Sequence, residues 1–445
     1  MRIRKRVAET TKWYGRTTAM GSRGLSRCLL VVTLMLAGSL LWSGSAGAQT
    51  TVIRAGHLID PATGKVTDNQ TIVVQDGKIA LVGAEVRVTP NTPLIDLSKS
   101  WVMPGLMDAH THLTLSLSRE QGLEESYLKT PTGWRLLQGV RNARGMLEAG
   151  FTTVRDVGNA ANYADADLRR AIEKGWFPGP TILNAGKIIT PFGGQSHGIA
   201  PEQGPFWRWE YLDADTPEEV RKAVRENIYY GATTIKLVTD NSKFYSTAEE
   251  VRAAVEEAHR AGMIVGVHVI RSDAARAVIE GGADSIEHGF DLNDDVLKLM
   301  KSKGIVLVGT DFPLAHLEFM GDSGGVIPPP KESAAMILDR LKRAYKIGVK
   351  MAFGSDSLAD MPGKTRGEAA MEYLDVWLAA GVPSPEILKA MTSNVAELLR
   401  LKGKRGAIAV GEAADIIATP ENPLADARAL KKVNFVMKDG RVLGK

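Results

Sequence analysis

A β-strand pattern followed by an amphipathic helix pattern recurs from residue 104 to residue 400, and this rhythm constrains the fold most. The run Thr216-Pro217-Glu218-Glu219 begins one helix with a capping box and a proline in the first turn, and Gly231 ends it. A strand is predicted at 233–238, a helix at 249–260 and another strand at 263–269. Later strands are predicted at 285–288, 305–309 and 349–354. Alternating strands and helices indicate parallel strands, and the length favours an α/β fold of the (β/α)8 barrel type. A doubly wound sheet is the alternative, but no glycine-rich phosphate loop follows an early strand.

The two ends of the chain show a different pattern, with short alternating strands separated by turn signals. Residues 51–85 contain Asp76-Gly77, and residues 411–445 contain Asp439-Gly440, both typical of tight hairpin turns. We therefore predict a flanking β-sandwich built from residues 49–103 and 401–445, with the barrel at 104–400 between them.

Residues 1–48 resemble a secretory signal peptide. They hold eight Lys or Arg against one acid, followed by an apolar run at 28–42 and by Ala46-Gly47-Ala48, a small-residue cleavage site. A membrane anchor is the rival interpretation, although about 20 apolar residues are needed to span a bilayer. We expect cleavage near Gln49, no stable membrane anchor afterwards, and an exported, periplasmic or secreted protein. The rest of the chain has 47 basic and 50 acidic residues, so its charge gives no reason to expect a nucleic-acid partner.

Histidines and an aspartate stand at the ends of predicted barrel strands. His110 and His112 are two residues apart, so on a strand they point to the same face. His268, His288 and Asp356 end or follow later strands. Because the carboxyl ends of barrel strands meet at one mouth, this set favours a site for divalent metal.

Lys236 lies inside the apolar strand at 233–238, where burying an ammonium is costly. A buried lysine can lose its proton, and the neutral amine can take up carbon dioxide as a carbamate that bridges two metals. The alternative is a lysine that reaches the strand end and pairs with an acid.

Taken together, several motifs resemble the amidohydrolase superfamily over essentially the whole chain after the leader. They are Pro104-Gly105-Leu106-Met107-Asp108-Ala109-His110-Thr111-His112, Ile286-Glu287-His288-Gly289, Gly354-Ser355-Asp356, residues 392–399, residues 406–415 and residues 439–442. Within it, the chain is most similar to the imidazolonepropionase-like branch that contains Xaa-Pro and Xaa-Arg dipeptidases and ochratoxin-type amide hydrolases.

This resemblance implies a role for each matching residue. His110, His112 and Asp356 would bind one divalent metal, His268 and His288 the other, and carboxylated Lys236 would bridge the two. A hydroxide between the metals would attack the substrate, and Asp356 would act as the catalytic proton shuttle. Zinc suits these ligands, while manganese, cobalt or iron can occupy similar sites. Relatives commonly assemble into homo-oligomers.

The substrate side is less determined. In many relatives a substrate-side histidine directly follows two glycines, whereas His197 lies two positions further along the chain. Tyr245 matches a family tyrosine that can bind a substrate carboxylate, although its position is equally compatible with an exposed tyrosine that has no such role. The aromatic segment 206–211 could form a pocket wall or a subunit contact. His57, His259 and His316 are interpreted as structural or solvated, with His316 in a loop, and residues 324–331 as a proline-rich loop.

We expect hydrolysis of an amide or peptide bond next to a free carboxylate, in a dipeptide or an N-acyl amino acid. The alternatives are deamination or cyclic-amide hydrolysis within the same superfamily, and a catalytically inactive metal-binding scaffold.

Overall fold

The computed structural model describes residues 50–86, 92–118, 123–159, 161–196, 200–240, 244–321 and 328–444. The leader predicted at residues 1–48 lies outside these ranges. None of the described helices combines the length and the apolar character that a membrane crossing requires.

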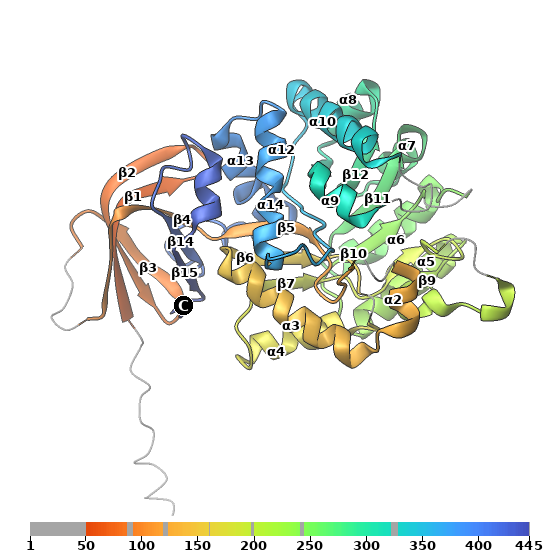
Figure 1. Ribbon diagram of the computed structural model, residues 1–445, viewed down its shortest axis with the longest axis horizontal. Helices are drawn as coiled ribbons and strands as arrows, with labels where there is room; N and C mark the ends of the chain where they lie inside the picture. The colour runs from red at the N-terminus through yellow and green to blue at the C-terminus, as the bar shows by residue number, and fades with distance from the viewer. Residues whose placement is uncertain are drawn as a thin grey trace, which may run out of the picture. The chain divides into compact units, whose positions relative to one another are not determined.

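Both ends of the described chain contribute to one seven-stranded sheet, in the order β16-β15-β14-β4-β1-β2-β3. In Figure 1 the red and orange N-terminal strands lie beside the dark blue C-terminal ones. The sheet curls so that β3 approaches the segment just before β14. There the backbone N–H of Ile79 donates to the Glu412 carbonyl at 2.9 Å. The strands are β1 (Thr50–Asp60), β2 (Lys65–Gln75), β3 (Lys78–Gly83), β4 (Leu94–Pro104), β14 (Ile416–Thr419), β15 (Phe435–Lys438) and β16 (Arg441–Val442).

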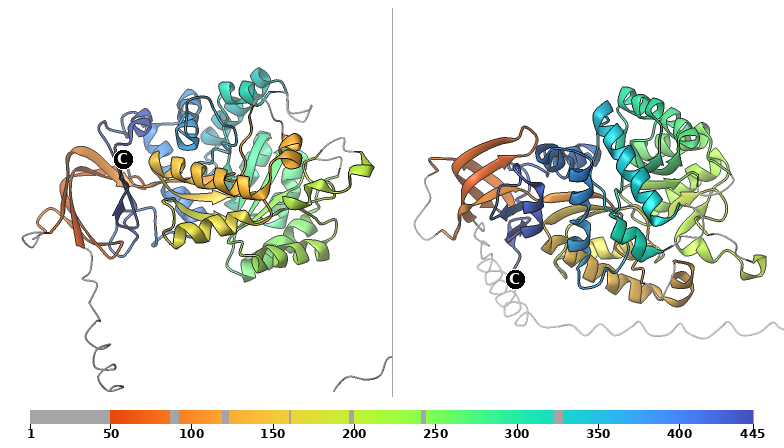
Figure 2. Two further views of the ribbon diagram at one scale, coloured as in Figure 1. Left: turned by 60° about the horizontal axis from the view of Figure 1, so that its bottom comes forward. Right: turned by 45° about the horizontal axis from the view of Figure 1, so that its top comes forward.

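Between these ends, two parallel sheets alternate with helices, as the rhythm of the sequence predicts. One sheet has the order β5-β6-β7 and the other β13-β12-β11-β10-β8-β9. Figure 2 shows helices packed around the outside of these strands. The strands are β5 (Leu106–Thr111), β6 (Phe151–Asp156), β7 (Thr181–Asn184), β8 (Ile188–Thr190), β9 (Tyr211–Asp213), β10 (Ile235–Val238), β11 (Val265–Arg271), β12 (Ser285–Asp291) and β13 (Val306–Val308).

The described strands do not pair as one closed ladder, so the prediction of a closed barrel is confirmed only in its parallel α/β character. The chain between β6 and β10 forms two short strands instead of one. Strand β7 pairs with β6, and β8 pairs with β10. Gly186, which lies between β7 and β8, has a φ of 69°. The predicted strand at 349–354 makes a single bridge, Leu307 to Met351. Its backbone still bonds on both sides, because Ala352 N–H donates to Leu307 at 3.0 Å and Ala109 N–H donates to Phe353 at 2.8 Å.

The helices begin largely where the sequence places their caps. The Thr216 hydroxyl accepts from Glu219 N–H at the start of α5, and Thr247 forms a capping box with Glu250 at the start of α6. The α-helices are α2 (Leu123–Lys129), α3 (Thr132–Glu148), α4 (Ala164–Glu173), α5 (Pro217–Tyr229), α6 (Ala248–Arg260), α7 (Ser272–Gly281), α8 (Asp294–Lys303), α9 (Leu314–Met320), α10 (Pro330–Ile347), α11 (Arg366–Ala370), α12 (Tyr373–Ala379), α13 (Ser384–Ala390) and α14 (Ser393–Leu398). The 3-10 helices are η1 (Pro201–Gln203), η2 (Phe206–Trp209) and η3 (Ala427–Lys432).

Two local predictions were wrong. His316 lies in helix α9 rather than in a loop, and its buried imidazole pairs with Glu372 at 2.8 Å. Pro330 and Lys331 belong to helix α10, because proline is compatible with the first turn of a helix. Residues 324–327 of the predicted proline-rich loop lie outside the described residues.

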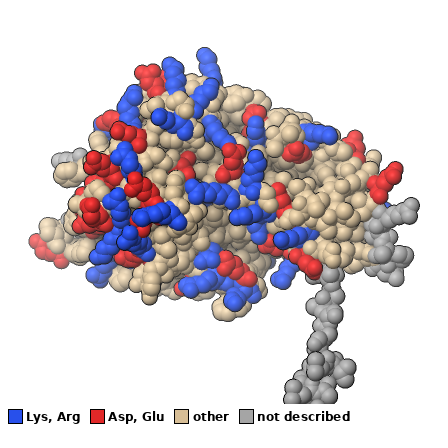
Figure 3. Space-filling model, turned by 180° about the vertical axis from the view of Figure 1, so that it is seen from behind, with Lys and Arg blue, Asp and Glu red and all other residues tan. Residues whose placement is uncertain are grey.

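Charged side chains of both signs are interspersed over the face shown in Figure 3. Many of them form exposed ion pairs, such as Arg225 with Glu257 at 2.6 Å. No field of a single sign therefore covers that face.

Candidate metal centre

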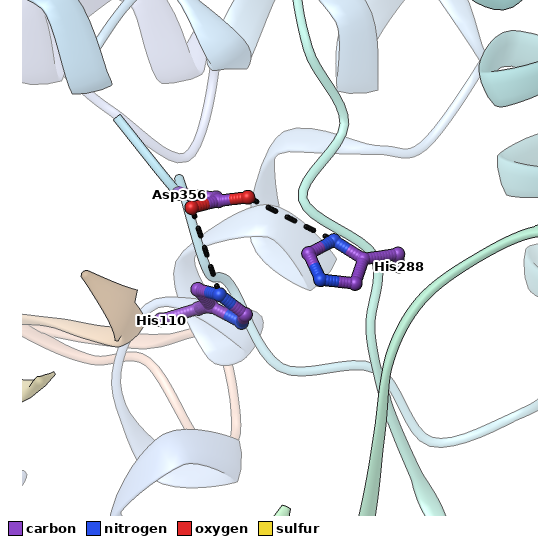
Figure 4. Close-up of side chains that lie close together, drawn as sticks. All are labelled: His110, His288 and Asp356. Carbon is purple, nitrogen blue, oxygen red and sulfur yellow. Dashed lines mark ion pairs between the residues drawn. The ribbon is translucent and has the colours of Figure 1, made fainter. Parts of the chain in front are cut away.

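Three of the residues predicted as ligands lie together at the ends of their strand segments. His110, His288 and Asp356 are buried, and one potential ligand atom from each lies within 4.8 Å of the others. Figure 4 shows the Asp356 carboxylate between the two imidazoles. One carboxylate oxygen, Oδ1, is 3.6 Å from His110 Nε2, and the other, Oδ2, is 3.8 Å from His288 Nδ1.

His112 joins the same cluster, as the two-residue spacing predicts. Its Nε2 is 3.3 Å from Asp356 Oδ1, and its ring centroid is 5.4 Å from that of His110. His268 lies on the other side, with its ring 4.3 Å from that of His288. The structure therefore brings all four predicted histidines and Asp356 into one cluster.

The tautomers of His110 and His112 make this cluster fit a cation. His112 Nδ1 donates to the Gly158 carbonyl at 3.0 Å, and His110 Nδ1 donates to the Glu287 carboxylate at 2.7 Å. Each Nε2 therefore carries a lone pair next to Asp356 Oδ1. Among the described residues, neither His110 Nε2 nor Asp356 Oδ1 has a hydrogen-bond partner. Buried acceptors that face one another without a shared hydrogen suit a metal ion.

Burial keeps these imidazoles neutral. It lowers the pKa of His112 to about 3, and lowers the pKa of His110, His268 and His288 well below the usual value of 6.5. The nearby Lys236 ammonium lowers the pKa of His110, His112 and His268 further. A neutral imidazole is the form that binds metal.

Lys236 is 2% exposed on strand β10, close enough to act electrostatically on all four histidines. Burial lowers its pKa, against the opposing effect of Glu287 and Asp356, while burial raises the pKa of Asp356. In the described part of the chain, Lys236 forms no ion pair with a carboxylate.

A buried network that the sequence analysis missed holds His110. Glu287 accepts from His110 through Oε2, and through Oε1 it accepts from Arg155 Nη2 at 2.6 Å and from the Ser285 hydroxyl at 2.5 Å. Arg155 on β6 and Glu287 on β12 are both fully buried. Asp108 fixes the backbone nearby, because its Oδ1 accepts from the N–H groups of His110 and Ser355 at 2.9 and 3.0 Å. The sequence signal that could have indicated Glu287 is a carboxylate directly before a histidine in a largely apolar strand.

Asp240 supports the neighbourhood of His268. Its Oδ2 accepts from the backbone N–H groups of Ile270 and Arg271 at 2.7 and 2.9 Å, and its Oδ1 is 3.8 Å from His268 Nε2. Tyr245 stands at this rim, 36% exposed, with the Arg271 guanidinium 5.2 Å from its ring centroid. His197, the other predicted substrate contact, lies outside the described residues.

The aromatic segment 206–211 is divided between the interior and the surface. Trp207 and Tyr211 are buried in a small cluster with Ile188 and Val238, whereas Trp209 is 47% exposed. This cluster adjoins the histidines, because a Cβ placed on Gly158 would contact both Ile188 at 2.7 Å and the His112 ring at 2.9 Å.

Comparisons with known proteins agree with this geometry. The chain is 31% identical to ochratoxinase of Aspergillus niger, with 89% of this chain and 87% of the relative covered. It is 26% identical to imidazolonepropionase of Maricaulis maris, covering 79% of this chain and 87% of the relative. The crystal structure of a Xaa-Pro dipeptidase with methionine bound in the active site superposes with a TM-score of 0.78, at 29% identity, covering 89% of this chain and 100% of that one. The model of the amidohydrolase family matches residues 101–443, and the chain belongs to this family of metal-dependent hydrolases that act on carbon–nitrogen bonds.

Proposed function

We propose that the chain is a binuclear metal-dependent hydrolase that cleaves an amide or peptide bond next to a free carboxylate. The observation that carries this proposal is the convergence of four neutral, buried imidazoles, Asp356 and Lys236 at one end of the parallel strands. The dipeptidase and ochratoxinase relatives support amide substrates that carry a carboxylate. We also infer that the interrupted strand segments correspond to the (β/α)8 barrel of the family, with residues 49–103 and 401–445 as the flanking β unit.

His110, His112 and Asp356 would hold one divalent ion, and His268 and His288 the second. Lys236, as a carbamate, would bridge the two, and zinc is the ion we propose for both. Bound ions would supply an activated water at neutral pH and polarise the scissile carbonyl. The six ligand residues all lie within the described part of the chain, and the groups that position them are themselves buried and hydrogen-bonded.

Asp356 would perform the proton transfers. Burial raises the pKa of its carboxyl group, so the side chain can hold a proton between two steps. Oδ1 faces His110 and His112, and Oδ2 faces His288, which leaves the carboxylate central to the cluster. It would accept a proton from the attacking water and deliver it to the leaving amine.

The aromatic cluster around Trp207 and Tyr211 favours a substrate with a bulky apolar group. Within this cluster, Ile188 lies beside His112. Val238 belongs to the same cluster and follows Lys236 by two residues in the sequence. Tyr245 is the proposed contact for the substrate carboxylate, and His197 is a further proposed substrate contact.

The test uses purified protein loaded with zinc, manganese or cobalt and matched substrate pairs. Each N-acyl amino acid or dipeptide is compared with its C-terminal carboxamide, and a cyclic amide and an aminated heterocycle form two further arms. We expect hydrolysis of the free acids, weak turnover of the carboxamides, and about two metal ions per active chain by elemental analysis. His268→Asn should abolish turnover, whereas His57→Asn, in the terminal sheet, should not. Turnover of only the cyclic amide or only the aminated compound, or one metal ion per fully active chain, would contradict the proposal.

We further propose that the protein is exported and that residues 1–48 are removed. The basic segment, apolar run and Ala46-Gly47-Ala48 of the sequence support this. N-terminal sequencing of the protein made by an exporting host should begin near Gln49, and an intact N-terminus on exported protein would exclude cleavage.

A further inference from the structure

Thr310, just after strand β13, has a backbone conformation that is unusual for its residue type. Its φ is 46°, although it is β-branched and fully buried. Such residues rarely adopt the left-handed region, and when they do the strain is typical of functional sites. The Thr310 hydroxyl is 2.7 Å from His288 Nδ1.

One buried guanidinium holds both neighbours of Thr310. Arg340 on helix α10 is fully buried, and its Nη2 donates to the Gly309 carbonyl at 2.8 Å. Its Nη1 forms an ion pair with Asp311 Oδ1 at 2.9 Å. Gly309 is needed for this approach, because a Cβ there would stand 2.4 Å from Arg340 Nη1. The residues before and after Thr310 are therefore fixed by the same side chain.

The hydroxyl oxygen is placed where it can accept a hydrogen from His288 Nδ1. Asp356 Oδ2 also lies on the Nδ1 side, at 3.8 Å, and a carboxylate there favours a hydrogen on Nδ1. With Nδ1–H donated to Thr310, Nε2 keeps its lone pair. Ring nitrogens that bind metal are commonly set by a hydrogen bond to the other nitrogen.

We propose that Thr310, held by Arg340 and Asp311, is a positioning residue that sets the tautomer and orientation of His288 for metal binding. This inference rests on the proposed role of His288 as a metal ligand. It predicts that the hydroxyl, rather than the volume of the side chain, determines the metal affinity of the site.

The test compares three variants of the full chain. Thr310→Val keeps the shape but removes the hydroxyl, Thr310→Ala removes it without β-branching, and Thr310→Ser retains it. The dissociation constants of Co²⁺ are measured by competition with a chromogenic chelator, together with the visible absorption of bound Co²⁺. The matched control is Thr152→Val, a buried threonine on β6 whose hydroxyl has no hydrogen-bond partner among the described residues.

We expect one of the two Co²⁺ dissociation constants to rise about 10- to 100-fold in the Val and Ala variants. The Ser variant and the control should resemble the wild type, and all variants should keep the wild-type circular dichroism. If Val does not fold, Ala still removes the hydroxyl. Unchanged Co²⁺ affinity in either folded variant, or equal weakening in the Ser variant, would overturn the inference while leaving the proposed function intact. A wild type that binds no second ion would overturn both.

Discussion

Replacing Glu287 with Gln tests the buried network behind His110. Glu287 receives three donors: Arg155 Nη2, the Ser285 hydroxyl and His110 Nδ1. Gln has the same shape but only one acceptor oxygen and an N–H2 group. If its oxygen stays with Arg155, its N–H2 faces His110 Nδ1. That nitrogen must then accept, and the ring hydrogen moves to Nε2, the atom that faces Asp356.

Two magnitudes follow from this geometry. Arg155 would be left as a buried charge without its carboxylate, which typically costs about 3–5 kcal/mol of unfolding free energy. Losing the partner that orients a metal-binding imidazole weakens metal affinity by about 10- to 100-fold. Glu256→Gln is the matched control, because Glu256 is exposed and its pair with Arg221 at 3.3 Å contributes at most about 1 kcal/mol.

Urea unfolding of metal-free protein measures the first effect, and Co²⁺ competition measures the second. The double variant Arg155→Met/Glu287→Gln separates them, because it removes both the unpaired charge and the donor that holds the Gln oxygen away from His110. We expect the double variant to lose less stability than the two single changes added together, and to bind metal more tightly than Glu287→Gln, because the amide oxygen can then accept from His110 Nδ1. Wild-type metal affinity in Glu287→Gln would refute the tautomer argument, and wild-type stability would refute the role assigned to the ion pair.

Three further predictions concern other groups. Lys236→Ala should lose most activity, and a short carboxylic acid that replaces the carbamate should restore part of it. Full activity in Lys236→Arg would exclude a carbamate, because arginine cannot form one. Asp356→Asn should lower kcat by about 10²- to 10⁴-fold while elemental analysis still finds metal; a loss of metal in proportion to activity would make Asp356 mainly a ligand. Burial raises the pKa of Glu210 from 4.5 to about 7. The folded chain therefore keeps a proton that the unfolded chain has released. The free energy of unfolding should then fall by up to about 3 kcal/mol as the pH rises from 4.5 to 7, and a pH titration of urea unfolding in which Glu210→Gln shows the same slope would contradict this.

The sequence was sufficient to predict the residues that meet at the candidate site. A two-residue period places His110 and His112 on one face of a strand, and both Nε2 atoms indeed face Asp356 Oδ1. His268 and Asp356 follow apolar runs, and parallel strands bring such positions to the same end. These are local patterns combined with one rule of topology.

The supporting residues could not be found in this way, because their contacts join distant parts of the chain. Arg155 reaches Glu287 from 132 positions away, and no local pattern indicates that pair. Strict alternation also predicts that Glu287 and His288 point to opposite faces. In the structure, Glu287 is hydrogen-bonded to the His110 ring and the His288 ring lies beside it. Both are possible because His288 has a φ of 66° and breaks the alternation.

The same break occurs within or just after three successive strand segments. His288, Thr310 and Asp356 all have positive φ, at 66°, 46° and 49°. Each such residue costs on the order of 1–3 kcal/mol, so the folded chain must hold them by other bonds. Asp356 N–H donates to the His110 carbonyl at 2.8 Å, and Arg340 fixes the residues on either side of Thr310. Regular strands can present only every second residue to the cluster, and a residue in the left-handed region adds the side chain that alternation would direct away from it. The periodic pattern therefore predicts each strand up to its last residues, and it fails where the chain departs from strand geometry to complete the candidate site.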